Sequence, residues 1–465
     1  MKAEELTTVD FTQKVRRPAV GGERAPGWAW QERRKQARRA DPSRLMVGKP
    51  DASLSSVGGL VSFGAWCRAE GIDEQLERQF GHLKTGSSVV YPMGSILRLL
   101  IDASVVGIPR VFGLEALAAD PLLVHLQGGA FPSTDTIYRD LQRFEAQDAQ
   151  RLERIVSRYG LAPAVQAKLK QVTLDIDPTV MGLFGEQQYA FVGYNPKYHG
   201  RPSYFPLVAR IAETDTVLGA RLRPGNSALG EADVEDIEAW LDQTREALPD
   251  ALITVRIDRG GDAKALFDAI DAKGAMFVIK MRQSLSLLQA AALHTDWETI
   301  DEDADGEPIA QVAELDFQRS DWTPGKYRVI ALRDKRRKQQ RQVPLWPGMD
   351  DSICFYVTND HFRTIEDIAL LYDDRAGIET LIRELKDSFG AGKMPSFSFD
   401  ANETAMLIKL LAHNLLRCWV LSHLPKQVHR WHADWIRWIA IRIPARLLHS
   451  GRRWIVRLAP RPMLN

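Results

Sequence analysis

Cysteine is scarce in this chain, and charge of one sign is not in excess. Its 465 residues include three cysteines, Cys67, Cys354 and Cys418. They lie too far apart for a zinc-binding pair or a disulfide framework, and a reducing compartment is expected. The formal net charge is +1. The whole chain therefore carries no charge signature for nucleic acid, and any basic surface must be local.

Uninterrupted apolar segments and familiar phosphate or nucleophile motifs are also missing. The first residues lack the apolar core of a signal peptide. The longest apolar run, residues 405–424, contains Lys409, His413, Asn414 and Arg417, so it predicts a buried amphipathic helix and not a membrane span. No Gly-rich phosphate loop, Gly-x-Ser-x-Gly or His-Glu-x-x-His is present. We expect a cytoplasmic protein that has no membrane partner.

Composition and periodicity divide the chain into six segments and predict an α/β fold. A basic N-terminal arm and a helical region come first, and strands then alternate with helices. This alternation is interrupted by a β-rich insertion, resumes, and gives way to a tail rich in Arg and Trp. The predicted boundaries are 1–56, 57–165, 166–283, 284–350, 351–424 and 425–465.

Two features of the first segments suggest contact with DNA. Residues 1–50 hold twelve Lys and Arg against six acids; this is either a solvated tail or an arm that touches phosphates. Farther on, Pro132-Ser133 begins a short predicted helix that carries Arg139, with Arg143 shortly after. It is either a recognition helix that presents Arg139 and Arg143 to DNA or a capped structural helix.

Two predicted strands end in carboxylates. Residues 172–177 alternate strictly, so Asp175 and Asp177 share one face. Residues 251–257 form a short apolar strand that is followed by Asp258 and two glycines. Carboxylates at strand ends lie where α/β sheets bind ligands. Either Asp of the first strand could instead cap the turn that follows.

The β-rich insertion carries a dense cationic run that includes Arg336, Arg337 and Lys338. Between two strands such a run fits phosphate contact. It equally fits an exposed strand edge that charge protects from aggregation.

A stretch near residue 380 places four functional side chains at helical spacing: Tyr372, Arg375, Glu379 and Lys386. Read as one helix at about 100° per residue, they share a narrow stripe. An acid flanked by two cations suits a metal site that faces a phosphate backbone. Asp177, Asp258 and Glu379 together could hold two divalent ions about 3.5–4 Å apart, and hard oxygen ligands favour Mg²⁺ or Mn²⁺.

These motifs, in this order, resemble the bacterial insertion-sequence DDE transposases. The last one matches the Tyr-x₂-Arg-x₃-Glu-x₆-Lys signature of the IS-four superfamily and of group-one DDE transposases. The first two match as Asp177-Pro-Thr179 and Asp258-Arg-Gly260. Residues 193–207 resemble the segment between the two aspartates in one branch of that group. The likeness covers about residues 60–420.

The resemblance implies an RNase H-like catalytic core with a β-rich insertion, preceded by a helical DNA-binding region. It implies catalysis by Asp177, Asp258 and Glu379 with two Mg²⁺ or Mn²⁺ ions, and cleavage and joining of DNA strands. Asp175 would lie behind these ligands or act as an alternate ligand. Tyr372, Arg375 and Lys386 would hold phosphates, and Trp322 or Trp346 would stack on a flipped base.

The same resemblance implies double-stranded DNA partners (element ends and target), a homodimer in the synaptic complex, and a bacterial cytoplasmic location at the nucleoid. Two alternatives stay open. The chain could be a metal-dependent endonuclease with the same core, or a DNA-binding protein that has lost catalysis.

Overall fold

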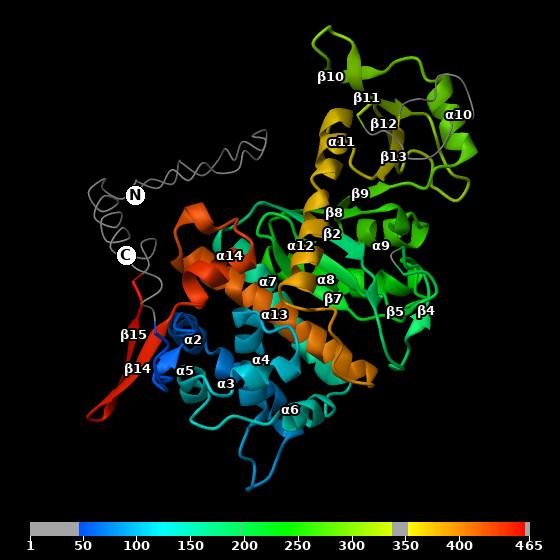
Figure 1. Ribbon diagram of the computed structural model, residues 1–465. Helices are drawn as coiled ribbons and strands as arrows, with labels where there is room; N and C mark the ends of the chain where they lie inside the picture. Colours follow the sequence, from blue (N-terminus) through cyan, green and yellow to red (C-terminus); the bar gives the residue numbers. More distant parts are fainter. Residues whose placement is uncertain (1–45, 197, 337–351, 461–465) are drawn as a thin grey trace, which may run out of the picture. The chain divides into compact units, whose positions relative to one another are not determined.

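The fold is built on a large mixed β-sheet (Figure 1). The computed structural model describes residues 46–196, 198–336 and 352–460. Within them the sheet has nine strands in the order β10-β11-β12-β13-β9-β8-β2-β6-β7. The core strands are β2 (Gln171–Pro178), β6 (Leu207–Ile211), β7 (Thr216–Arg221), β8 (Leu252–Ile257), β9 (Met276–Lys280) and β13 (Ser352–Thr358). β8 runs parallel to both β2 and β9, and the other neighbours are antiparallel.

Both faces of the central strands are covered, which explains why they read as nearly continuous apolar runs. On β9, Ile279 packs in the cluster that includes helices α8 (Val234–Ala247) and α9 (Lys264–Ala272). Its neighbour Val278 packs in a second cluster, with helix α11 (Ile365–Asp373). Side chains of one strand alternate between the two faces, so this sheet is a central layer between helices.

The insertion extends this sheet. Its strands β10 (Glu298–Glu302), β11 (Pro308–Leu315) and β12 (Arg328–Asp334) follow helix α10 (Leu285–Leu293). β12 pairs with β13, and β13 pairs with β9. β11 and β12 lie in the segment 284–350 that was predicted to be rich in β-strands, and the main-chain ladder continues from the core strands into the insertion.

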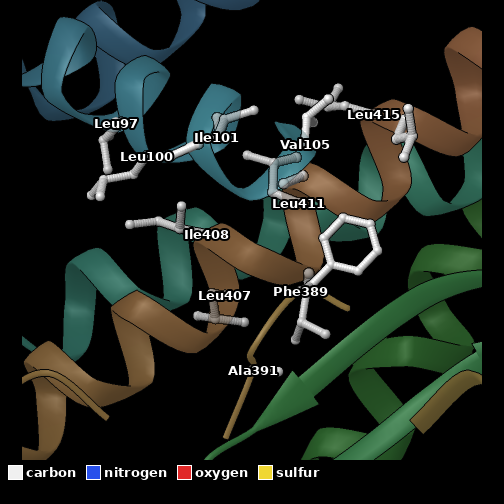
Figure 2. Close-up of a cluster of buried hydrophobic side chains, with 14 of the residues drawn as sticks. Leu97, Leu100, Ile101, Val105, Phe389, Ala391, Leu407, Ile408, Leu411 and Leu415 are labelled. Atoms are coloured by element: carbon white, nitrogen blue, oxygen red, sulfur yellow. The ribbon is translucent and has the colours of Figure 1, made fainter. Parts of the chain in front are cut away.

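The part of the described chain before β2 is largely helical, and its core is shared with a helix from near the C-terminus. The helices before the sheet are α2 (Leu60–Ala69), α3 (Ile72–Phe80), α4 (Met93–Val106), α5 (Pro121–Leu126), α6 (Thr134–Leu141) and α7 (Ala146–Gln166). Figure 2 shows side chains of α4 against those of α13 (Phe399–His423), with Phe389 beside them. Residues 57–165 therefore do not have a hydrophobic core of their own.

Helix α13 is the helix that the apolar run 405–424 predicted. Among the described residues it is the one helix whose length and apolar composition would allow it to cross a membrane. In the structure, 89% of its most apolar window is buried inside the protein. The polar residues that interrupt the run include Asn414, which bonds to main-chain atoms of Val156 and Val217. These contacts are those of a core helix.

The Arg/Trp-rich tail folds back onto the helical region. After helix α14 (Ala433–Ile436), strands β14 (Ala445–Ser450) and β15 (Arg453–Leu458) form a hairpin, and β14 pairs with β1 (Leu54–Ser55). Arg437 is fully buried and donates to the carbonyls of Ser104 and Val105 at the end of α4, at 2.9 Å each. A helix leaves its last carbonyls without partners, so this arginine completes α4.

Candidate active site

Three acids from three different elements line one cleft. Asp177 lies at the end of β2, and Asp258 directly follows β8, the parallel neighbour of β2. Because parallel strands end at the same edge, the two aspartates come together there. Glu379 lies in the first turn of helix α12 (Ala376–Asp387). All three line a cleft of about 1100 Å³.

The stretch that carries Glu379 is not one helix, and that prediction was wrong. Helix α11 ends at Asp373 and α12 begins at Ala376. Between them the amide of Arg375 bonds to the carbonyl of Tyr372, three residues back, at 3.0 Å. Such a turn advances about 120° per residue, so three residues make one full turn. Tyr372, Arg375 and Glu379 therefore still line one hollow beside Asp258, although they do not belong to one helix.

The backbone at the junction approaches a buried arginine. A Cβ atom added to Gly377 would lie 2.5 Å from Nη1 of Arg210. Only glycine fits without a shift, so Gly377 allows the start of α12 to pack closely on the sheet.

Tyr372 and Arg375 contact the acids themselves. The Tyr372 hydroxyl donates to Oδ1 of Asp258 at 3.2 Å. Nη2 of Arg375 forms an ion pair with Oδ1 of Asp177, and the Arg375 side chain is 7% exposed. These residues were expected to bind phosphates; in this structure their polar groups hold the two aspartates in place.

Lys386 also bonds to the protein. Its ammonium group donates to Oγ1 of Thr179 at 2.6 Å and to the carbonyl of Val180 at 2.8 Å. Both acceptors belong to the segment just after Asp177. Lys386 therefore fixes the backbone that follows the first aspartate, and it lines the same cleft.

The environments of the two aspartates shift their pKa values in opposite directions. Burial raises the pKa of Asp177 to about 6, and the charges of Asp258 and Glu379 add to this, while Arg375 opposes it. Burial also raises the pKa of Asp258, but the amide of Arg259 and the charge of Arg375 outweigh it, so the net pKa is lowered. Titratable groups perturbed in a cleft are typical of a functional site.

The donor chemistry fits a divalent cation. Three carboxylates face one cleft, and their mutual repulsion contributes to the raised pKa of Asp177. Hard oxygen donors of this type suit Mg²⁺ or Mn²⁺. Among the residues that the structure describes, however, no three His, Cys, Asp or Glu side chains are close enough to form a complete metal site. Arg375 provides the positive charge next to Asp177.

Asp175 does not reach the cleft. It is fully buried and pairs with Nη1 of Arg210 at 2.8 Å and with Nε of Arg256 at 2.6 Å. With both oxygens bound by guanidinium groups, it cannot act as an alternate metal ligand in this arrangement. The expectation of a ligand role was wrong, because cross-strand arginines neutralise this acid.

The predicted DNA-contacting arginines lie on exposed surfaces where the structure describes them. Arg139 is on α6, whose N-terminus is capped by Ser133 as the capped-helix alternative requires. Arg143 pairs with Asp140 at 3.1 Å. In the insertion, Arg336 pairs with Asp301 at 2.7 Å and with Asp334 at 2.9 Å. Arg337, Lys338 and Trp346 lie outside the described residues, as do positions 1–45 of the basic arm.

Trp322 is not available for stacking on a base. It is 5% exposed and packs in the core with Phe267, Phe317 and Tyr327. The expectation was wrong for this residue because its ring fills the space between the insertion and helix α9.

The cleft contains residues that the sequence reasoning missed. Arg259, Arg282 and Lys393 give it additional positive charge, and Tyr194 and Tyr198 contribute aromatic rings. Two signals could have found some of them. Arg259 directly follows Asp258, and residues 189–204 are unusually rich in tyrosine and phenylalanine.

Comparison with known proteins places the chain in a family. No curated protein matches the sequence. Among solved structures, the piggyBac transposase in a synaptic complex with hairpin DNA is similar, at 10% identity and a TM-score of 0.40, over 82% of this chain and 79% of that one. The model of the transposase DDE domain group 1 family matches residues 43–462, a range that includes all but the last three residues of the Arg/Trp-rich tail. The chain belongs to this family of DNA transposases.

Proposed function

We propose that this transposase acts on an insertion sequence. It would bind the inverted-repeat ends of the element, cleave them, and join them to target DNA. The observation that carries the proposal is the meeting of Asp177, Asp258 and Glu379 in one cleft lined by basic side chains. The Tyr-x₂-Arg-x₃-Glu-x₆-Lys spacing supports assignment to the IS-four superfamily. The sheet, in which antiparallel β6 and β7 flank parallel β2, β8 and β9, supports an RNase H-like core.

In this proposal Asp177, Asp258 and Glu379 hold Mg²⁺ or Mn²⁺, as two ions. Bound there, such ions lower the pKa of an attacking water or hydroxyl and neutralise charge on the phosphate during in-line displacement.

The chain's own residues hold two of the three acids in position. Arg375 fixes the carboxylate of Asp177, and Tyr372 fixes that of Asp258. Lys386 holds the segment after Asp177. The cationic groups of Arg375 and Lys386 lie at the cleft. Incoming phosphates would therefore compete with the protein acceptors for these two groups. Contact of Arg375 and Lys386 with DNA phosphates belongs to the proposal on these grounds.

The proposal includes partners and location. Double-stranded element ends would contact the basic arm, residues 57–165 and the cationic run of the insertion, including Arg139, Arg143 and Arg336. Two copies would pair in a synaptic complex. The protein would work in the bacterial cytoplasm, at the nucleoid.

The test is cleavage of DNA that flanks the coding sequence. Full-length protein, a plasmid carrying both flanks, and Mg²⁺ or Mn²⁺ should give cuts at the terminal repeats and joined products. Asp177→Asn, Asp258→Asn and Glu379→Gln should each lower cleavage by roughly 10³-fold or more, because each removes a charged oxygen ligand. Asp387→Asn is the matched control, since Asp387 lines the same cleft but is not one of the three.

The outcomes separate the alternatives. Cleavage without joining would indicate an endonuclease, and binding without cleavage would indicate a catalytically inactive copy. An equal loss in Asp387→Asn and Asp177→Asn would refute the assignment of the three acids.

A further inference from the structure

A segment beside the acidic cleft exposes an unusual number of aromatic rings. It runs between the first and second aspartates and forms a small three-stranded sheet of β3 (Met181–Gly182), β5 (Pro202–Tyr204) and β4 (Phe191–Val192). Its exposed rings are Phe184, Tyr189, Phe191, Tyr194 and Tyr198, which are 46% to 85% exposed. Scattered exposed rings need no explanation, but a cluster of them marks an interaction surface.

Two of these rings flank an arginine. The guanidinium carbon of Arg201 lies 4.4 Å from the ring centre of Phe184 and 4.9 Å from that of Tyr198. Of the described carboxylates, none forms a salt bridge with Arg201. We call Phe184, Tyr194, Tyr198 and Arg201 the aromatic platform. It combines flat apolar faces with an unneutralised positive charge.

The aromatic platform lies between two hollows. Tyr194 and Tyr198 line the cleft that contains Asp177, Asp258 and Glu379. Phe184 lines a smaller cavity of about 270 Å³, to which Arg110, Phe112 and Lys409 also contribute. Gly182, Gly392 and Lys393 line both hollows. A strand that leaves the acidic cleft toward the smaller cavity would therefore pass over the platform.

The backbone under the aromatic platform is tightly packed. A Cβ atom on Gly193 would lie 1.9 Å from the carbonyl oxygen of Gly225, and one on Gly225 would lie 2.1 Å from that of Ser203. Main chains this close leave little freedom at Gly193, so the backbone next to Tyr194 is held in place. Such preorganisation reduces the entropy lost on binding.

We propose that the aromatic platform binds unpaired DNA bases next to the cleavage position. Stacking on rings and on a guanidinium plane requires exposed base faces, which a duplex hides and an unpaired strand offers. The cations at Arg201 and Lys393 fit the phosphates of that strand. That a cleavage position lies next to the bound bases rests on the proposed function. The binding of unpaired bases to the rings does not.

The test measures binding and needs no catalysis. Full-length protein without divalent ion would be titrated with fluorescent oligo(dT) and, separately, with a blunt duplex of the same length. We expect Tyr194→Ala, Tyr198→Ala and Phe184→Ala each to weaken oligo(dT) binding by roughly 5-fold to 100-fold, since stacking on one ring supplies about that much affinity. Duplex binding should change less than about 2-fold.

Two further sets of variants keep the test decisive. Tyr194→Phe and Tyr198→Phe should retain oligo(dT) affinity, because they preserve the ring. Phe362→Ala is the matched control, since Phe362 is 88% exposed but does not line either hollow. Arg201→Gln should lower oligo(dT) affinity and also the slope of its salt dependence.

Three results would overturn the proposal. Unchanged oligo(dT) affinity in the alanine variants would show that the rings do not stack on bases. Equal losses for duplex and oligo(dT) would indicate general DNA contact. A change in sedimentation from dimer to monomer, with oligo(dT) affinity intact, would assign the rings to a protein interface. Loss of cleavage in Asp177→Asn tests the proposed function separately, so the two can fail independently.

Discussion

Asp175 and Asp177 stand two residues apart on the same strand, and their surroundings differ completely. Asp175 is fully buried, and its direct cross-strand partners are Arg210 on β6 and Arg256 on β8. Asp177 is opposite Val208 on β6, and Arg375 reaches its carboxylate from the turn before helix α12. The first acid is neutralised within the sheet, and the second only from the side of the cleft.

This difference separates a structural carboxylate from a functional one. A buried charge is tolerated when opposite charges and hydrogen bonds satisfy it fully, as at Asp175. At Asp177 the balance is incomplete, because two further carboxylates line the same cleft and its pKa is raised to about 6. Removing charge at Asp175 should therefore affect folding, whereas removing charge at Asp177 should affect chemistry.

The largest expected effect is the loss of stability in Asp175→Ala. The substitution leaves Arg210 and Arg256 buried without their shared partner, which typically costs about 3–5 kcal/mol. Urea denaturation followed by circular dichroism would measure it. Asp177→Asn, the comparison variant, should lose no stability, because it removes a charge that burial disfavours. A loss as large as that of Asp175→Ala would remove the distinction between the two acids.

Sequence alternation predicted that the two aspartates share a face, and it could not tell them apart. What distinguishes them is the register of three strands, which brings Arg210 and Arg256 opposite Asp175 across 35 and 81 residues of chain. Local sequence contains no record of that register. The strand ends at Asp177 and Asp258 were predictable, because a break after an apolar run is local.

The site helix shows a similar limit. The spacing of Arg375 and Glu379 correctly placed both at the cleft. The same periodicity failed to show the turn between α11 and α12, because Arg375 is drawn toward Asp177 by a long-range contact. The role of the C-terminal tail was less predictable still. Arg437 completes helix α4 from more than 300 residues away, and composition alone does not distinguish it from the other arginines of the tail.

The second expected effect is a pH dependence that belongs to Asp177. Its pKa is higher in the folded protein, at about 6, than the usual 3.8 of an unfolded chain. The folded state therefore binds more protons between about pH 4 and pH 6, and stability falls as pH rises through that window. The contribution is of the order of 3 kcal/mol. Denaturation of the metal-free protein at several pH values should show this fall, and Asp177→Asn should flatten it.

A smaller effect is expected from Arg375→Lys. An ammonium keeps the charge but loses the planar donor geometry that fixes Asp177, so cleavage should fall by about tenfold. Stability should change little. Arg210→Lys sharpens the comparison, because there the same exchange should lower the unfolding free energy and leave the rate of cleavage per folded molecule intact. If the two variants showed the same pattern, Arg375 would be as structural as Arg210.

The smallest expected change in stability belongs to the two glutamates of α12. Glu379 is exposed at the cleft, whereas Glu384 is buried and its Oε1 accepts from the amide of Ala433 at 2.7 Å. Glu384→Gln keeps an acceptor for that amide, so it should cost less than about 1 kcal/mol of stability and leave cleavage near the wild-type rate. Glu379→Gln should leave stability unchanged and nearly abolish cleavage. Thermal melts beside the cleavage assay would compare them. Comparable cleavage losses in both variants would mean that the helix as a whole, and not the face that carries Glu379, determines activity.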